Sequence, residues 1–513
     1  MNFISFSFLV FLPIVLAGYF ILPNRFRWIF LLIASYYFYM SWSPVFAVLL
    51  FTSTLIFYLS SLGIDKYREN KKIKNVCFLS GLLLNIGMLF VFKYYNFFQG
   101  QLDEIGFYSL VNYKLPALDF LLPMGISFYT FQGISYLIDV NRGELKAEKH
   151  LGLMMLYKAY FPLLVAGPIE RGVNLIPQIR NVLMGKQENR VFFEYGRVVS
   201  GLRLVLLGFF KKIVLADNFS LIVHPVFHAP ETFSATSALI ATLAFTFQIF
   251  FDFSAYTDIA RGVSRILGFE MIENFNRPYF ASNISDFWKR WHISLSSWFR
   301  DYLYIPLGGS RVDKWRWFLN LWIVFILCGF WHGANWTFLL WGAMHGFYYF
   351  LYYVLAPMIN WIKIKTPLGK HPKLCKTIAI FFTFTLVSLA WVVFRAESLQ
   401  KALEIWVSIG NVPMEFYGFL SLFFEHFSAR TAINVFGLKW LFYSNERISL
   451  LPIYLFIYTL IYLVYSYHAR DQDDGPYFAI WPLIYRWCAY LFALFSILLF
   501  GNFGGFQFIY FQF

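Results

Sequence analysis

The sequence predicts an all-α protein that crosses a membrane many times, and two observations support this fold class. First, 59% of its 513 residues are apolar and only 14% are charged, whereas soluble domains are nearer half apolar and a quarter charged. Second, apolar runs of about 17–25 residues, the length that spans a bilayer as a helix, recur along the whole chain. No soluble domain fits between them, so we expect a single membrane domain over residues 1–513.

The apolar runs predict about eleven transmembrane helices. The first run lacks a basic region and a small-residue cleavage site, so we interpret it as a retained helix and not as a signal peptide. The expected spans are 3–22, 27–42, 45–62, 76–94, 198–215, 236–257, 316–330, 337–356, 377–394, 452–467 and 478–500. Residues 95–118 are expected to form an outer loop, and residues 402–450 are too mixed to assign.

Two further segments predict irregular structure inside the membrane. Residues 119–139 return inward but are interrupted by Pro123, Gly125 and Gly133. Residues 151–168 are apolar with basic residues on both flanks, which predicts a re-entrant segment that begins and ends on the cytoplasmic side. Because irregular backbone at this depth needs protein or a cavity around it, we expect an internal cavity.

The net charge of +14 does not indicate a nucleic-acid partner. The basic residues lie in short loops between apolar runs, as the positive-inside rule predicts for cytoplasmic loops. Basic loops at 24–27 and 65–74 place the N-terminus outside, and the loop before the last run places residues 501–513 outside as well. The four cysteines are scattered without CxxC spacing, so neither a metal site nor a disulfide framework is indicated.

Residues 286–305 hold too many charges for a helix that faces lipid. Their bulky apolar side chains recur at spacings of three and four, which is typical of one helix face. These side chains are Trp288, Trp291, Leu295 and Trp298. We therefore expect an interfacial or re-entrant helix here.

His332 is the first candidate for chemistry, because an ionisable side chain between two apolar runs is costly. Its neighbours Gly329, Gly333 and Asn335 are expected to loosen the helix and expose backbone to the cavity. A neutral imidazole there can take a proton from a hydroxyl and return it to a leaving thiolate. The alternative is a histidine satisfied by a hydrogen bond between helices.

His292 is the second candidate and lies among tryptophans and charges. One interpretation is an anchor at headgroup depth. The other is a second polar group of the cavity that helps to bind a thioester donor, whose phosphates Lys289 and Arg290 could pair with. Further candidates for the cavity lining are Trp291, Trp331 and Asn335.

The C-terminal segment 501–513 is rich in aromatic residues and ends with a single hydroxyl, Tyr510, among its last six positions. It is either an aromatic belt at the outer interface or a tail that enters the outer mouth of the cavity. In the second case Tyr510 could accept an acyl group once His332 removes its proton. Asp252, Asp258 and Arg261 lie near a membrane boundary. They form either a packing pair or a cavity pair, and the residues leave this open.

Five blocks of the sequence resemble the membrane-bound O-acyltransferase family, in the bacterial branch that acetylates exported polysaccharides. The blocks are Phe131–Asp139, Leu164–Arg171, Asp286–Arg311, Trp331–Gly346 and Trp391–Ala396. The resemblance implies a ring of helices around a central tunnel, with His332 as the catalytic residue and His292 as the second important one. The final Phe-Ile-Tyr-Phe-Gln-Phe is similar to the acyl-carrying tail of a small partner peptide in the related D-alanylation system, which implies that Tyr510 is an acyl relay.

The same resemblance implies an enzyme of the bacterial cytoplasmic membrane, surrounded by lipid, with both termini extracytoplasmic. Acetyl-CoA would dock at the cytoplasmic mouth as the acyl donor, without a metal. Acetyl would leave on the outer side, where a separate SGNH-type transferase would place it on a polysaccharide such as alginate. Two alternatives remain: D-alanyl, lipid or protein acylation by the same family, and a transporter or channel that uses His292 and His332 as a polar gate.

Overall fold

The structure is a computed structural model, and it is described for residues 1–111, 114–165, 167–184, 193–423, 433, 436–444, 447–468, 481–504 and 508–509. Within these residues the chain is helical apart from its loops and a pair of two-residue strands, β1 (Tyr443–Ser444) and β2 (Arg447–Ile448). This confirms the all-α prediction. Six of the described helices are long and apolar enough to cross a membrane, and the count of eleven stays a prediction.

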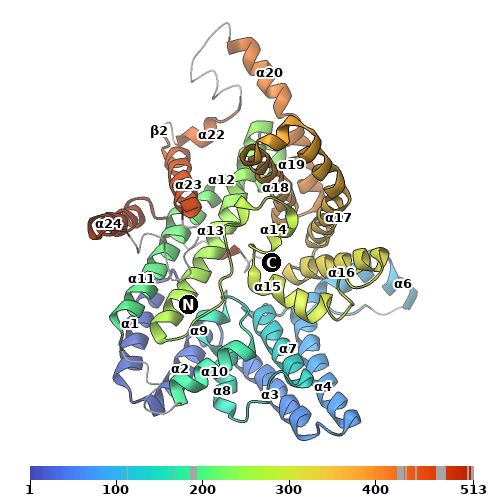
Figure 1. Ribbon diagram of the computed structural model, residues 1–513, viewed down its shortest axis with the longest axis vertical. Helices are drawn as coiled ribbons and strands as arrows, with labels where there is room; N and C mark the ends of the chain where they lie inside the picture. Colours follow the sequence, from blue (N-terminus) through green and yellow to red (C-terminus); the bar gives the residue numbers. More distant parts are fainter. Residues whose placement is uncertain are drawn as a thin grey trace.

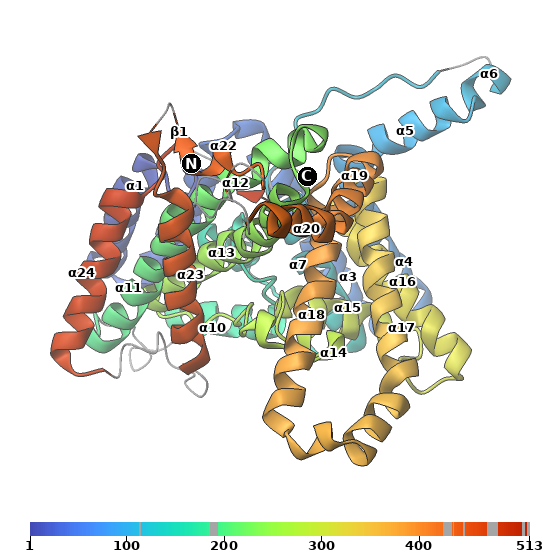
Figure 2. The ribbon, with the colours of Figure 1, turned by 90° about the horizontal axis from the view of Figure 1, so that it is seen from above.

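The first four apolar runs form the helices that the sequence predicts, with the fourth longer than expected. These are α1 (Phe6–Ile21), α2 (Asn24–Met40), α3 (Pro44–Lys66) and α4 (Lys71–Leu89), which continues through the π-helix η1 (Phe90–Tyr94) into α5 (Tyr95–Glu104). The outer loop predicted at 95–118 is therefore wrong in its first half, which is helical and is followed by the short α6 (Phe107–Val111). Figure 2 shows α5 and α6 extending away from the rest of the protein.

The segment that begins at Pro123 becomes helical only at Ile126, where α7 (Ile126–Arg142) starts. Gly125 has a positive φ of 71°, and an added Cβ would overlap the carbonyl oxygen of Leu164. Gly133 does not interrupt α7, contrary to expectation, since the helix continues to Arg142. The missing side chain of Gly133 instead makes room for the Phe57 ring. The apolar run 151–168 is broken, as predicted, into the short helices α8 (Leu151–Ala159) and α9 (Phe161–Leu164), followed by α10 (Gly172–Met184).

A long, largely buried helix, α13 (Ala235–Leu267), runs through the middle of the protein. It packs against α11 (Tyr195–Phe209), the π-helix η3 (Phe210–Ala216) and α12 (Asp217–His228). In Figure 1, α13 runs through the centre of the view beside α11 and α12. These α13 contacts position one half of the candidate site.

The predicted single helix over 286–305 is wrong. The chain instead forms α14 (Ile284–Trp288), α15 (Ile293–Phe299) and the π-helix η6 (Arg300–Tyr304). The interruption comes at His292, whose φ of 43° is left-handed, a conformation that no residue of a right-handed α-helix adopts. The aromatic face that the spacing indicates is thus divided between two short helices.

Three longer helices deliver the other half of the site: α16 (Lys314–His332), α17 (Trp336–Lys365) and α18 (Pro372–Arg395), which stand side by side in Figure 2. Gly329 does not loosen α16, contrary to expectation, since the helix continues unbroken to His332. Its lack of a side chain lets α17 approach, because an added Cβ would overlap the carbonyl oxygen of Phe338. Close approach through small residues is typical of packed helices in membranes.

The helices that follow α18 in the described chain lie on the outside of this body. They are α19 (Leu399–Gly410), α20 (Val412–Phe423), α22 (Lys439–Phe442), α23 (Leu451–His468) and α24 (Leu483–Phe500). Beyond α24, Phe508 and Ile509 are 0% and 2% exposed. These two residues of the predicted tail therefore lie inside the protein, whereas Phe503, nearer to α24, is 63% exposed. Tyr510 falls outside the described residues.

Candidate active site

His332 is the last residue of α16 and is 4% exposed. Its ring lies edge-on to two aromatic rings from neighbouring helices, at centroid distances of 5.1 Å from Trp341 and 5.2 Å from Phe394. The backbone leaves the helix at Gly333, which is extended. The end of one helix and the faces of two others thus hold the imidazole in a defined orientation.

His292 is 1% exposed and precedes the first turn of α15. Its left-handed φ of 43° is a strained conformation for a residue with a side chain, and such strain clusters at functional sites. The ring packs 4.6 Å from Phe253 of α13. Neither ring nitrogen has a hydrogen-bond partner within the described part of the chain, which is unusual for a buried polar group.

Trp331 lies next to both histidines and joins them into one cluster. Its ring centroid is 5.0 Å from that of His332 and 6.0 Å from that of His292. Phe128 of α7 packs against the same indole at 5.3 Å. The structure therefore brings together two histidines that are forty positions apart in the sequence.

A pocket lies beside His332, which is one of its lining residues. It is lined by Lys93, Leu122, Pro123, Met124, Gly125, Ile126, Ser127, Phe128, Val165, Trp331 and His332. The irregular stretch before α7 and the end of α16 both contribute to this lining. Trp331 belongs to it, and its role there, like the internal cavity that the sequence predicts, stays a prediction.

Lys93 is a residue of this pocket that sequence reasoning missed. It lies in the π-helix η1, and its ammonium donates hydrogen bonds to the carbonyl oxygens of Trp331 at 2.7 Å and of His332 at 2.9 Å. A cation at these carbonyls satisfies the C-terminal end of α16 and complements its dipole. The signal was available, because a lysine inside the apolar run 76–94 is costly unless it has a function.

We expect Lys93→Met to reduce acyl transfer about 10- to 100-fold, since a hydrogen bond from a charged group contributes roughly 1.5–3 kcal/mol and its loss frees the end of α16. The turnover number should fall more than the affinity for the donor, because the side chain orients His332. Steady-state kinetics of the purified protein measures both quantities. Lys114→Met, which removes an exposed lysine paired with Asp103, is the matched control, and equal activities in the two variants would contradict the role of Lys93.

The remaining predicted residues lie around the site without lining this pocket. Lys289 is exposed, and Arg290 pairs with Asp286 at 2.7 Å. Trp291 is buried 4.9 Å from the ring of Trp391. Asn335 begins α17 by accepting a hydrogen bond from the amide of Thr337 at 3.0 Å. Their proposed parts in donor binding stay predictions.

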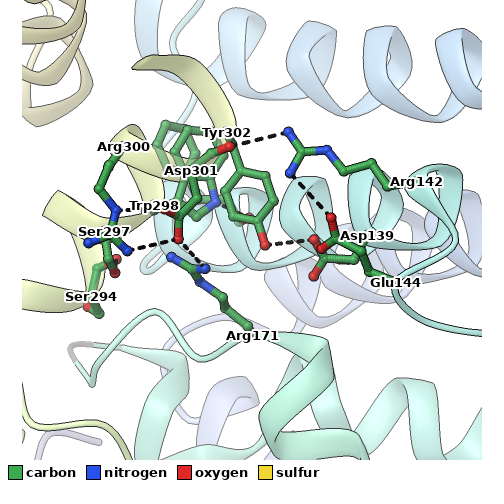
Figure 3. A network of polar contacts seen from close by, with 11 residues as sticks. Asp139, Arg142, Glu144, Arg171, Ser294, Ser297, Trp298, Arg300, Asp301 and Tyr302 are labelled. Carbon is green, nitrogen blue, oxygen red and sulfur yellow. Dashed lines mark hydrogen bonds and ion pairs between the residues drawn. The ribbon is translucent and has the colours of Figure 1, made fainter. Parts of the chain in front are cut away.

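A polar network, drawn in Figure 3, connects α15 and η6 to α7 and α10. Asp301 accepts hydrogen bonds from Arg171 at 2.6 Å and from Arg300 at 2.7 Å. Burial alone would raise the pKa of Asp301, but these two guanidinium groups outweigh it and hold the pKa below its usual value. Tyr302 donates to Asp139 at 2.8 Å. The network joins three of the sequence blocks that carry the family resemblance. It also holds the end of α15, the short helix that follows His292.

The geometry suits acid–base chemistry at a hydroxyl. Among the described residues no group of three or more His, Cys, Asp or Glu side chains could hold a metal ion. A buried neutral imidazole at the wall of a pocket can accept a proton from a bound hydroxyl and donate it to a leaving group. His332 has this position, whereas His345 is buried among aromatic rings and accepts a hydrogen bond from Trp288 at 3.3 Å.

Comparison with known proteins identifies the family of this chain. A family model described as MBOAT, membrane-bound O-acyltransferase family, matches residues 150–394, which include both histidines. A probable alginate O-acetylase of Pseudomonas aeruginosa is 37% identical over 399 residues, which cover 77% of this chain and 72% of that protein. A peptidoglycan O-acetyltransferase of Helicobacter pylori is 34% identical over 424 residues, covering 77% of each chain.

A more distant relative is a teichoic acid D-alanyltransferase of Bacillus subtilis, 28% identical over 312 residues that cover 59% of this chain and 73% of that protein. The matches to the two O-acetyltransferases each cover 77% of this chain and are longer than the match of the family model to residues 150–394. The chain is a membrane O-acetyltransferase, and it belongs to the membrane-bound O-acyltransferase family.

Proposed function

We propose that this protein takes acetyl from acetyl-CoA at the cytoplasmic face of a bacterial inner membrane and supplies it for the O-acetylation of an exported polysaccharide. The observation that carries the proposal is the position of His332, buried at the wall of a pocket and inside the family match. The names of the relatives favour a polysaccharide acceptor, since they act on alginate and peptidoglycan.

In the proposed reaction, His332 accepts the proton of an acceptor hydroxyl while the oxygen attacks the thioester carbonyl. The tetrahedral intermediate collapses by breaking the carbon–sulfur bond, and the imidazolium returns the proton to the departing thiolate. An O-acetyl ester and free coenzyme A are the products, so atoms and charge balance. His292, one ring away across Trp331, helps to bind or orient the thioester.

The acceptor in this proposal is Tyr510, from which a separate SGNH-type transferase outside the membrane passes acetyl to the polysaccharide. Support comes from the two described residues before it, because Phe508 and Ile509 are buried within the protein and not spread on its surface. Phe508 packs 5.7 Å from Phe253, which in turn contacts His292. Both chain termini are extracytoplasmic in this scheme.

The proposal is tested with the purified protein in sealed vesicles that contain labelled acetyl-CoA on one side only. We expect release of free coenzyme A thiol on that side and retention of labelled acetyl by the protein in an ester linkage. A transporter would instead move intact donor without releasing thiol, and turnover only with a D-alanyl donor would indicate the chemistry of the Bacillus subtilis relative. Either result would contradict the proposal.

A further inference from the structure

We propose that a buried ion triad, Lys212, Asp217 and Asp252, anchors the C-terminal tail, and that Asp252 is thereby a positioning residue for acyl transfer. The anchoring of the tail is independent of the proposed function. The positioning role of Asp252 in acyl transfer rests on the proposed function.

The triad lies where η3, α12 and α13 meet. The Lys212 ammonium is 2.7 Å from Asp217 and 2.8 Å from Asp252, and the three side chains are 1%, 2% and 3% exposed. Burying such charges is expensive unless each is paired and hydrogen-bonded. One ammonium does not neutralise two carboxylates, so the arrangement favours a further hydrogen-bond donor.

The tail supplies that donor. The backbone N–H of Ile509 donates to Oδ2 of Asp252 at 2.8 Å, in a contact between residues 257 positions apart. Hydrogen bonds to a buried carboxylate are among the stronger ones in proteins. The sequence left open whether Asp252 packs or faces a cavity, and the structure shows that it binds Lys212 and the tail.

The same corner of the fold also holds the start of the tail. The side-chain amide of Asn218 donates to the carbonyl oxygen of Phe500 at 2.8 Å. The backbone N–H of Asn502 donates to the carbonyl oxygen of Ile213 at 3.0 Å. The chain is thus held where it leaves α24 and again at Ile509. Two attachments to one corner define where the described end of the tail lies.

The attachment at Ile509 directs the tail toward the histidine cluster. Phe508 packs 4.4 Å from the ring of Tyr256 and 5.7 Å from that of Phe253, and Phe253 contacts His292 at 4.6 Å. Asp252 lies on the same helix, next to Phe253. A rigid attachment immediately before Tyr510 in the sequence lowers the conformational entropy that an acceptor must lose to reach a reacting geometry.

Two variants break the contact from opposite sides. Ile509→Pro removes the donating N–H without touching the triad, and Asp252→Ala removes the acceptor. Asp258→Ala is the matched control. Asp258 lies on α13, like Asp252, and forms a similarly close buried ion pair with Lys211 at 2.6 Å. No hydrogen bond joins it to a described tail residue. Thermal unfolding of all three reports general damage to the fold.

Hydrogen exchange of the peptide that contains residue 509, measured by mass spectrometry, tests the anchor without any activity assay. We expect exchange to become at least about tenfold faster in Ile509→Pro and Asp252→Ala and to stay as in the native protein in Asp258→Ala. Unchanged exchange in Ile509→Pro would overturn the anchor, even if Asp252→Ala fails to fold.

Acetyl transfer then tests the positioning role. In the two tail variants we expect the turnover number to fall at least about tenfold with little change in the KM for acetyl-CoA, because the donor site is intact. Full turnover in Ile509→Pro with a released tail would overturn the positioning role. Absence of acetyl transfer in the native protein would instead overturn the proposed function, and the exchange result would still decide the anchor.

Discussion

Replacing His332 with alanine is expected to lower acetyl transfer about 10²- to 10⁴-fold, the range that a positioned general base contributes. His332 is one of the residues that line the pocket, and the rotation of its imidazole is restricted by Trp341 and Phe394. Water that enters the vacated space cannot reproduce this orientation. Thiol release from acetyl-CoA, followed continuously with the purified variant, measures the loss.

His345→Ala is the matched control for the His332 variant. His345 is 0% exposed in the same aromatic cluster, 4.8 Å from the ring of Trp341, but it does not line the described pocket. Both substitutions leave a space of the same size, so we expect similar decreases in the unfolding temperature. Only His332→Ala should lose the chemistry, and full activity in a folded His332→Ala protein would rule out the proposed general base.

Replacing Tyr510 with phenylalanine is expected to abolish acetylation of the polysaccharide, because it removes the one hydroxyl among the last six residues. The substitution keeps the aromatic ring and removes only the hydroxyl. Mass spectrometry of the C-terminal peptide after incubation with labelled acetyl-CoA should find acetyl on the native tail and none on the variant. The acetyl content of polysaccharide from cells that produce each protein gives the second measurement.

Tyr485→Phe provides the comparison for this change, since Tyr485 is 60% exposed on α24 and lies in no described pocket. It should retain native acetylation. An unmodified native tail during active turnover would exclude Tyr510 as the relay while leaving the role of His332 intact. The acceptor hydroxyl would then have to come from another molecule.

His332 could be found from the sequence because it violates a local rule. A titratable side chain between two apolar runs is conspicuous wherever it packs, and His332 and Lys93 both meet this description. The sequence pattern predicts His332 as a candidate, and the same rule applies to Lys93, which lies in an equally apolar run. The contact between them joins residues 239 positions apart, and no local pattern reports such a distance.

Backbone conformation was the second point at which sequence reasoning failed. The spacing of Trp288, Trp291, Leu295 and Trp298 predicts a continuous helix, because periodicity describes side chains and not φ angles. His292 is left-handed in the middle of that pattern. Only the surrounding contacts, such as the Phe253 ring and the network around Asp301, can hold a residue in a conformation that its own preferences oppose.

The sequence by itself determined that this protein is helical and lies in a membrane, since hydrophobicity and charge belong to each residue wherever it lies, and it predicted a reactive histidine at position 332. Only the tertiary structure decided which polar groups meet: Lys93 with the end of α16, His292 with Trp331, and Asp252 with both Lys212 and the tail. The physical reason is that a buried charge or amide must find a partner, and packing of distant helices, not neighbouring sequence, determines which partner is within reach.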